Sequence, residues 1–120
     1  MKRSTHITDE TGKVLFRPVF IMDTPFKRVI GLMGKRTISP DAAYLFPRCT
    51  SIHTCFMRVP IDVVFLDSSL QVLGVETLAP WHLSQRPRGT HAIIETAAHA
   101  ADAKGIEKTT TLIMRGDCDV

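Results

Sequence analysis

Residues 52–67 read Ile-His-Thr-Cys-Phe-Met-Arg-Val-Pro-Ile-Asp-Val-Val-Phe-Leu-Asp, and this stretch decides the fold class. Its two halves, 52–59 and 61–67, are rich in β-branched and aromatic residues, which favour strands. Pro60 separates them, because proline removes one donor from a strand ladder and marks a bend or bulge. The stretch therefore predicts two consecutive strands, and the residues after Leu66 predict a hairpin turn.

Shorter β-prone runs and two helical patterns flank this stretch. Further strands are expected at residues 14–22, 43–46, 71–77, 90–96 and 110–114. Pro18 lies inside the first of them, which favours an edge strand or two short pieces. Short helices are expected at 24–34, after the Thr24-Pro25 start signal, and at 97–104. We expect a mainly β fold: a compact single-domain β-sandwich or squat barrel of six to seven strands with two short helices.

Length and composition narrow the class of protein. The chain has 120 residues, of which 44% are hydrophobic and 22% charged. This length fits one domain and excludes a two-domain enzyme, and the apolar content excludes intrinsic disorder. Residues 1–13 are polar without periodicity, so we expect a flexible N-terminal arm followed by a single β-rich domain over 14–120.

Charge and cysteine content indicate the environment. The formal net charge is +3, a mild excess that would not by itself hold the chain on nucleic acid or on an anionic membrane. Three cysteines without paired spacing favour reduced thiols and a cytoplasmic location. No apolar run is long enough to span a bilayer, so membrane insertion is not expected.

Three side chains with soft-metal chemistry share one face if residues 52–59 form a strand. Residues two apart point to the same side, so His53, Cys55 and Met57 lie together. Imidazole, thiol and thioether suit copper(I). The alternative places Cys55 and Met57 in the core, with His53 hydrogen-bonded at its edge. No second ligand pair follows, so we favour the core and expect no metal and no cofactor.

Two acidic residues lie within apolar strand patterns. Asp62 follows the Pro60 bend, and Glu95 follows two isoleucines. Burial without a partner would cost several kcal/mol, so each acid must be exposed on a wet face, hydrogen-bonded or paired, with Arg58 among the candidate partners of Asp62. If the two acids converge, they could bind a cation, a sugar or an amine, or act as general acid and base.

The segment 80–89 is an expected irregular surface loop, because it holds two prolines, a glycine and the only tryptophan. Trp81 and His82 supply the aromatic and polar groups that recognition surfaces use. A further alternative is the basic region 25–60, which could hold a single nucleic-acid strand by charge and stacking. A solvated basic face is the commoner reason for such a pattern, so we do not expect nucleic acid.

Gly31-Leu32-Met33 and the stretch 52–67 together resemble a known family. An aromatic residue, a methionine, a short gap and Ile-Asp before an apolar strand are similar to the bacterial and archaeal domain-of-unknown-function family 192. Three further residues follow in the family's order: Pro80, Glu95 and Gly105. The resemblance covers about residues 20–112.

The resemblance implies a compact, mostly β domain with no established activity. Residues that fit its pattern and are expected to serve structure are Gly31, Leu32, Met33 and Pro60; Met57, Asp62 and Glu95 fit it as well. Some relatives are encoded beside pilus-assembly or secretion genes, which implies a protein partner. The chain departs from the family's glycines at His99 and at 109–110, so the backbone there is expected to differ.

Three functions remain open at this point. The first is a small non-enzymatic binding or accessory domain. Its candidate binding residues are His53, Met57, Asp62, Trp81, His82 and Glu95. The second is a small hydrolase or lyase that uses Asp62 or Glu95 with a histidine, and the third is a single-strand binder that uses the region 25–60. The paired-acid enzyme requires both acids on one side of the sheet.

Overall fold

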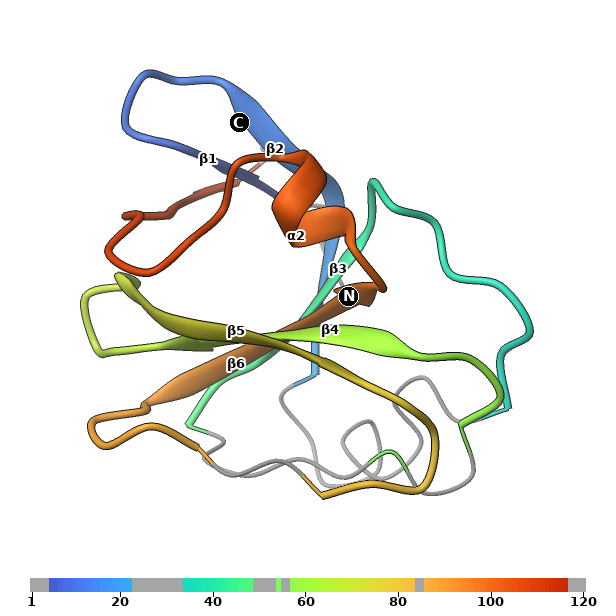
Figure 1. Cartoon of the computed structure of the whole chain (residues 1–120). Helices are drawn as coiled ribbons and strands as arrows, with labels where there is room; N and C mark the ends of the chain where they lie inside the picture. Colours follow the sequence, from blue (N-terminus) through green and yellow to red (C-terminus); the bar gives the residue numbers. More distant parts are fainter. Residues whose placement is uncertain (1–4, 23–33, 49–53, 55–56, 84–85, 117–120) are drawn as a thin grey trace.

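The computed structural model describes residues 5–22, 34–48, 54, 57–83 and 86–116. The chain forms one curved sheet, with a single short helix among the described residues (Figure 1). The strands are β1 (Thr5–Thr8), β2 (Val14–Ile21), β3 (Ala43–Phe46), β4 (Ile61–Leu66), β5 (Val72–Leu78), β6 (Ala92–Ala97) and β7 (Ile113–Gly116), and the helix is α2 (Ala100–Ala103). The fold is mainly β, as the sequence predicts.

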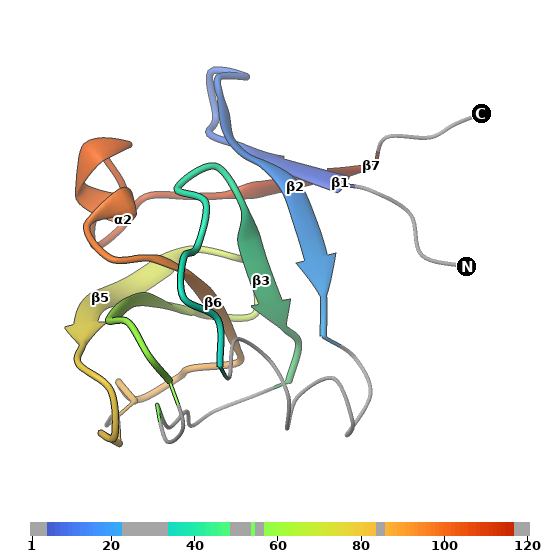
Figure 2. The same cartoon turned by 90° about the vertical axis from the view of Figure 1, so that its right-hand side faces the viewer.

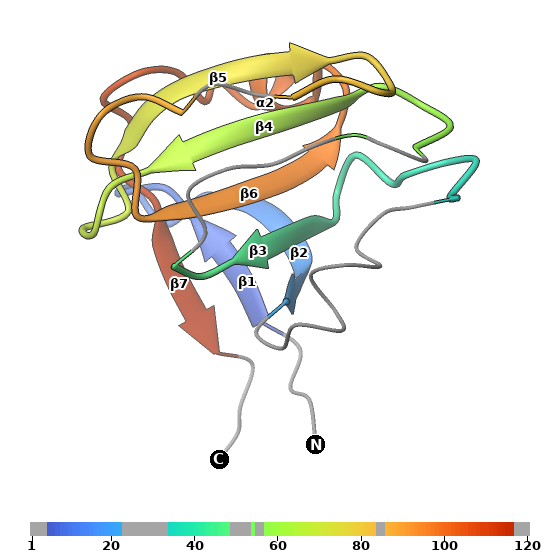
Figure 3. The ribbon, with the colours of Figure 1, turned by 90° about the horizontal axis from the view of Figure 1, so that it is seen from below.

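The seven strands are ordered β5-β4-β6-β3-β2-β1-β7 across the sheet. Every pair is antiparallel except β2 and β3, which run parallel. Figure 3 shows β5, β4, β6 and β3 as successive strands, with β5 at the margin and α2 behind it. Seen from the side, β1 and β7 run together on the opposite side of the molecule from α2 (Figure 2). Strand β5 is therefore an edge.

The sheet curls until its two ends nearly meet. Before β7, the chain passes β5 and bonds to it: Val72 N–H donates to the Thr110 carbonyl at 2.7 Å, and Thr109 N–H donates to the Val72 carbonyl at 2.8 Å. An isolated bridge between Gln71 and Thr111 lies beside these bonds. Beyond Val72 the two segments diverge. The result is a squat barrel that is closed at one end of β5 and open along the rest of that strand.

Apolar side chains cover both faces of the sheet. The first core fills the inside of the curl and includes Phe16, Val64, Ile94, Ala101 and Ile106. The second core lies on the other face and includes Phe46, Met57, Ile61, Val63 and Ile93. All six residues of β4 are buried, and so are five of the six in β6. These central strands thus behave like the doubly covered strands of a layered fold, which carry nearly continuous apolar sequences.

The N-terminal segment differs from the expected arm. Residues 5–8 form β1, which lies inside the sheet between β2 and β7. Ile7 explains this placement, because it is 1% exposed and belongs to the first core. The expectation for Pro18 also differs: β2 is an interior strand. Pro18 is accommodated there because the register between β1 and β2 shifts over Arg17 and Pro18, and a bulge is a place where a missing donor costs little.

The predicted strand at 52–59 is wrong over its described part. Thr54 and Met57 are buried, and neither lies in a strand; Arg58 and Val59 form a bend. The apolar content reflects burial under the second core instead of pairing. The helix predicted at 24–34 lies outside the described residues except for Gly34. Within the described parts of the chain, no helix is long and apolar enough to cross a membrane.

Candidate functional site

Asp62 is a buried carboxylate on the inner face of the sheet. Its side chain is held by two donors: the Thr77 hydroxyl donates to Oδ1 at 2.7 Å, and the Ala101 backbone N–H donates to Oδ2 at 3.1 Å. Each oxygen of the carboxyl group thus accepts one hydrogen bond. Asp62 is 1% exposed and forms no ion pair with any described residue. Of the alternatives left open by the sequence, Asp62 is thus hydrogen-bonded, and Arg58 is not its partner.

A pocket of about 390 Å³ opens beside Asp62. It lies where β5 and the segment after β6 diverge, so the incomplete closure of the barrel creates it. Its lining residues are Asp62, Gly74, Val75, Thr77, His99, Asp102, Ile106, Glu107 and Lys108. The strand supplies one wall, and the α2 segment supplies the other. This volume falls in the range of small-molecule sites.

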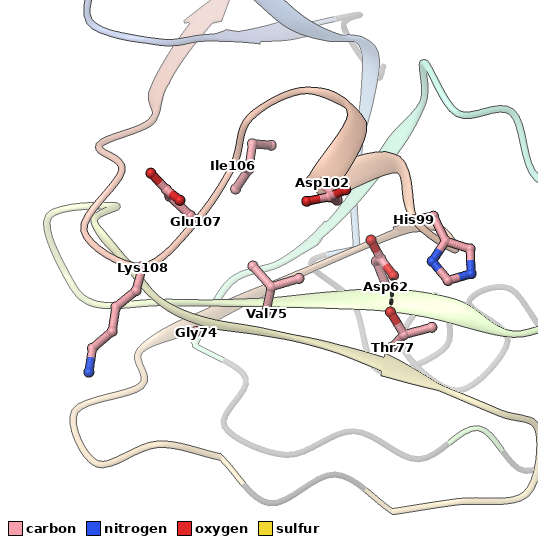
Figure 4. A pocket seen from close by; sticks show the side chains of 9 residues that line it. All are labelled: Asp62, Gly74, Val75, Thr77, His99, Asp102, Ile106, Glu107 and Lys108. Atoms are coloured by element: carbon pink, nitrogen blue, oxygen red, sulfur yellow. Dashed lines mark hydrogen bonds between the residues drawn. The ribbon is translucent and has the colours of Figure 1, made fainter.

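The lining of the pocket has a distinct order (Figure 4). Asp62, Asp102 and His99 gather at one end, and Glu107 and Lys108 lie at the other. Val75 and Ile106 lie between the two ends. Three carboxylates face one lysine, so the lining is negative. The pocket therefore has an apolar middle and an acidic end.

Glu95 is buried in a different way. It is 4% exposed and lies on the outer face, where Tyr44 and Val63 are its cross-strand neighbours. Its side chain hydrogen-bonds to no described residue. Burial raises the pKa of Glu95 from 4.5 to about 8. Removal from water disfavours the charged form, so the carboxyl is mainly neutral at pH 7.

The two acids do not converge. Asp62 pairs with Thr96 and Val63 pairs with Glu95 along the same two strands, and neighbouring residues of a strand point to opposite faces. Asp62 thus faces the first core, whereas Glu95 faces the second. This placement excludes an enzyme in which both acids act on one substrate. His99 shares the pocket with Asp62, whereas Glu95 does not line it.

Trp81 and His82 lie on a turn after β5, apart from the residues that line the pocket. The fully buried Thr54 holds this turn: its hydroxyl donates to the Ala79 carbonyl at 2.7 Å and accepts from the His82 backbone N–H at 2.7 Å. Trp81 is 61% exposed and has a left-handed backbone, with a φ of 66°. His82 is exposed, and its Nδ1 donates to the Pro80 carbonyl at 2.9 Å. The turn presents both side chains outward, as expected for a surface loop.

The remaining sequence candidates are either buried or outside the described residues. Met57 is 6% exposed and packs in the second core. His53, Cys55, Gly31, Leu32 and Met33 lie outside the described residues. Within the described ranges, no group of three His, Cys, Asp or Glu residues is placed to hold a metal. In the basic region, Tyr44 stacks on Phe20 with ring centroids 5.1 Å apart, so its ring is engaged in packing.

Sequence reasoning missed four polar residues of the pocket as members of one site: Thr77, Asp102, Glu107 and Lys108. Thr77 is more than twenty residues away from the other three in the chain. The pocket forms only because the segment 99–108 passes beside β5, at the open side of the barrel. No local pattern encodes that contact. The only sequence feature that pointed to this segment was His99, which stands where the family usually has a glycine. The backbone of His99 is left-handed, with a φ of 69°, at the start of α2.

Comparison with known proteins gives relatives in sequence and in fold. A UPF0127 protein of Thermococcus sibiricus is 38% identical over 100 residues, which are 80% of this chain and 65% of the relative. The chain thus spans less than two thirds of that relative's length.

Two crystal structures share the fold. A protein of Sinorhizobium meliloti 1021, provisionally described as a transcription regulator, has a TM-score of 0.76 and 21% identity over 97% of this chain and 94% of its own. A protein of unknown function from Novosphingobium aromaticivorans has a TM-score of 0.77 and 19% identity over 92% and 83% of the two chains. At these identities the likeness concerns the fold alone. The family model DUF192, described as "Uncharacterized ACR", matches residues 6–114, and the chain belongs to this uncharacterised family.

Proposed function

We propose that this protein is a non-enzymatic binding domain whose pocket between β5 and the α2 segment takes a ligand with a positively charged group. One observation carries the proposal. The Asp62 carboxylate is 1% exposed at the pocket wall, accepts two hydrogen bonds from uncharged donors and has no cationic partner among the described residues. A buried charge without a counter-charge is costly, and a bound cation offsets that cost.

The rest of the lining supports a cation over an anion. Asp102 and Glu107 add two exposed carboxylates, against one lysine, Lys108, and one histidine, His99, on the wall. Their field lowers the free energy of a cation in the pocket and raises that of an anion. Hydrogen-bonding capacity also remains, because a carboxylate has about four acceptor positions and Asp62 uses two of them.

Amide NMR of ¹⁵N-labelled protein tests the proposal with matched four-carbon probes. The probes are n-butylammonium, butyrate and 1-butanol, which share an alkyl chain and differ in charge. We expect n-butylammonium to shift amides of the pocket wall, among them Gly74, Val75, Thr77 and Asp102. Butyrate and butanol should leave these amides in place at the same concentration.

Two variants separate the pocket from general electrostatics. Asp102→Asn removes an exposed carboxylate of the pocket and should weaken n-butylammonium binding at least twofold. Glu76→Gln is the matched control, because Glu76 lies on the same strand but is paired with Val63 on the opposite face. It should leave the affinity unchanged. Equal shifts with butyrate, or shifts that avoid the pocket wall, would overturn the proposal.

A cytoplasmic location and a protein partner belong to the same proposal. Three cysteines without paired spacing favour a reducing compartment.

The exposed Trp81 and His82 remain candidate contacts for a protein partner, since exposed aromatic residues are enriched at binding hot spots. Pull-down of the tagged full chain from its native cell, compared with a Trp81→Ala variant, tests that part. We expect the wild-type chain to capture a protein that the Trp81→Ala variant does not capture.

A further inference from the structure

The outer edge of β5 adjoins the pocket and is open. Strand β5 is the last strand of the sheet, and its pairing with the segment before β7 ends at Val72. From Gly74 to Leu78, no backbone group bonds outside β4 to any other described residue. Val75, Glu76 and Thr77 are all exposed. Five residues span about 16 Å, the length of a short strand.

Two of the usual devices that block strand addition, proline and lysine, are absent from this edge. Natural edges are protected by proline, lysine, inward charges or covering loops. Residues 72–78 contain neither proline nor lysine, and the register shift of β5 lies at its start, around Val72. The chain itself already adds backbone there through residues 109 and 110. An incoming strand would continue this existing pairing along the rest of β5.

We propose that β5 receives an extended segment of a partner protein by strand addition, and that one lysine or arginine of this segment enters the pocket. The inference rests on the proposed function, because it uses the same cation pocket. In strand addition, main-chain hydrogen bonds supply affinity, and a pocket for alternate side chains supplies specificity. Here the edge and the pocket share Gly74, Val75 and Thr77, so one segment reaches both.

The order of the pocket lining selects a long basic side chain. Such a side chain has an apolar stem and a charged head, and it buries the stem along apolar surface. Val75 and Ile106 line the middle of the pocket and suit the stem. Asp62 and Asp102 lie together at one end and suit the head. A short cation would leave the apolar middle unfilled, and an acidic side chain would meet three carboxylates.

Fluorescence polarisation with labelled peptides tests the inference on the intact protein. The parent probe is a blocked seven-residue peptide of alternating threonine and valine with a central lysine. We expect it to bind at least tenfold more tightly than the same peptide with norleucine or glutamate at the centre, and the arginine peptide should behave like the lysine peptide. Asp102→Asn should weaken the lysine peptide, whereas Glu10→Gln, which changes an exposed carboxylate outside both the β5 edge and the pocket lining, should not.

Backbone methylation isolates the strand pairing. Two further peptides carry N-methyl groups on alternate amides, one in each of the two possible registers. Only alternate amides of an added strand face its neighbour, so one methylated peptide should lose binding at least tenfold and the other should retain it. Equal binding of both to the parent level would overturn strand addition, and equal binding of the norleucine peptide would overturn the choice of a basic side chain. If n-butylammonium still binds in the pocket, the proposed function survives either failure.

Discussion

The two faces of β4 and β6 hold two buried acids in opposite ways. On the inner face, two hydrogen-bond donors and an adjoining pocket surround the carboxyl group of Asp62. On the outer face, Glu95 has no described hydrogen-bond partner, and burial raises its pKa to about 8. The residues are one position out of register on neighbouring strands. The comparison shows that a buried acidic residue does not by itself make a binding site. The hydrogen-bond donors around its carboxyl group and the space beside it decide whether it does.

The largest expected effect concerns Glu95 and pH. Its pKa is about 8 in the folded protein and 4.5 as the reference value for the unfolded chain. The stability it contributes is therefore fully present below pH 4.5 and is lost as the pH rises through the folded pKa, because ionisation favours the unfolded state. The loss between these limits is on the order of 5 kcal/mol, at about 1.4 kcal/mol per pKa unit. Glu95→Gln should remove this pH dependence.

Urea unfolding at pH 5 and at pH 8.5 measures this difference. The wild type should be less stable at the higher pH, and Glu95→Gln should be the more stable protein there. The exposed Glu76→Gln is the control and should follow the wild-type profile. An equal loss in the wild type and in Glu95→Gln would show that Glu95 is charged at neutral pH.

The second prediction removes the acceptor on the inner face. Asp62→Ala leaves the buried Ala101 N–H without its acceptor and removes the acceptor of the exposed Thr77 hydroxyl, which water can replace. A buried unsatisfied donor costs about 1–3 kcal/mol, so we expect a loss of about 2 kcal/mol at pH 7. Chemical unfolding measures it. A loss below about 0.5 kcal/mol would mean that water satisfies both donors and that Asp62 is less enclosed than the structure shows.

The third prediction addresses one of those donors. Thr77→Val keeps the shape of the side chain and removes the hydroxyl that bonds to Asp62 at 2.7 Å. A hydrogen bond to a charged group contributes about 1.5–3 kcal/mol, and the exposure of Thr77 places the expected loss near the lower end. Thr77→Ser keeps the hydroxyl and should recover most of the stability. If both variants lose equal stability, the methyl group and not the hydrogen bond is responsible.

The smallest effect on stability separates structure from binding. Asp102 is exposed, so Asp102→Asn should change the free energy of unfolding by less than about 0.5 kcal/mol. The same variant should weaken n-butylammonium binding, as proposed above. Thermal unfolding and NMR titration on one preparation provide both values. A large loss of stability would assign Asp102 to the fold and remove it from the binding site.

The sequence predicted local features well where one segment decides them. Strand β3 was predicted with its observed bounds and β4 within one residue, because runs of β-branched and aromatic residues end at proline or polar turns. The exposed Trp81 turn followed from its prolines and glycine. The burial of both acids did not follow, because alternation assumes one wet face, whereas apolar clusters cover both faces of the central strands.

The candidate site could be predicted only in part. Asp62 was recognised as an acid that needs partners, but both of its partners come from other segments, Thr77 on β5 and Ala101 on α2. The position of β5 at the edge of the sheet and the path of residues 99–108 over the barrel mouth are long-range features. The strand predicted over residues 54 and 57 is the opposite kind of error. Apolar surroundings suggested strand pairing there, whereas these residues are buried by packing without strand pairing.

Carboxyl ¹³C NMR at pH 7, before and after addition of n-butylammonium, tests the central difference between the two faces most directly. Glu95 should show the chemical shift of a neutral carboxyl, and only the Asp62 signal should move when the ammonium ion is added. A carboxylate shift at Glu95, or an Asp62 signal that does not respond while the ammonium ion binds elsewhere, would contradict the account.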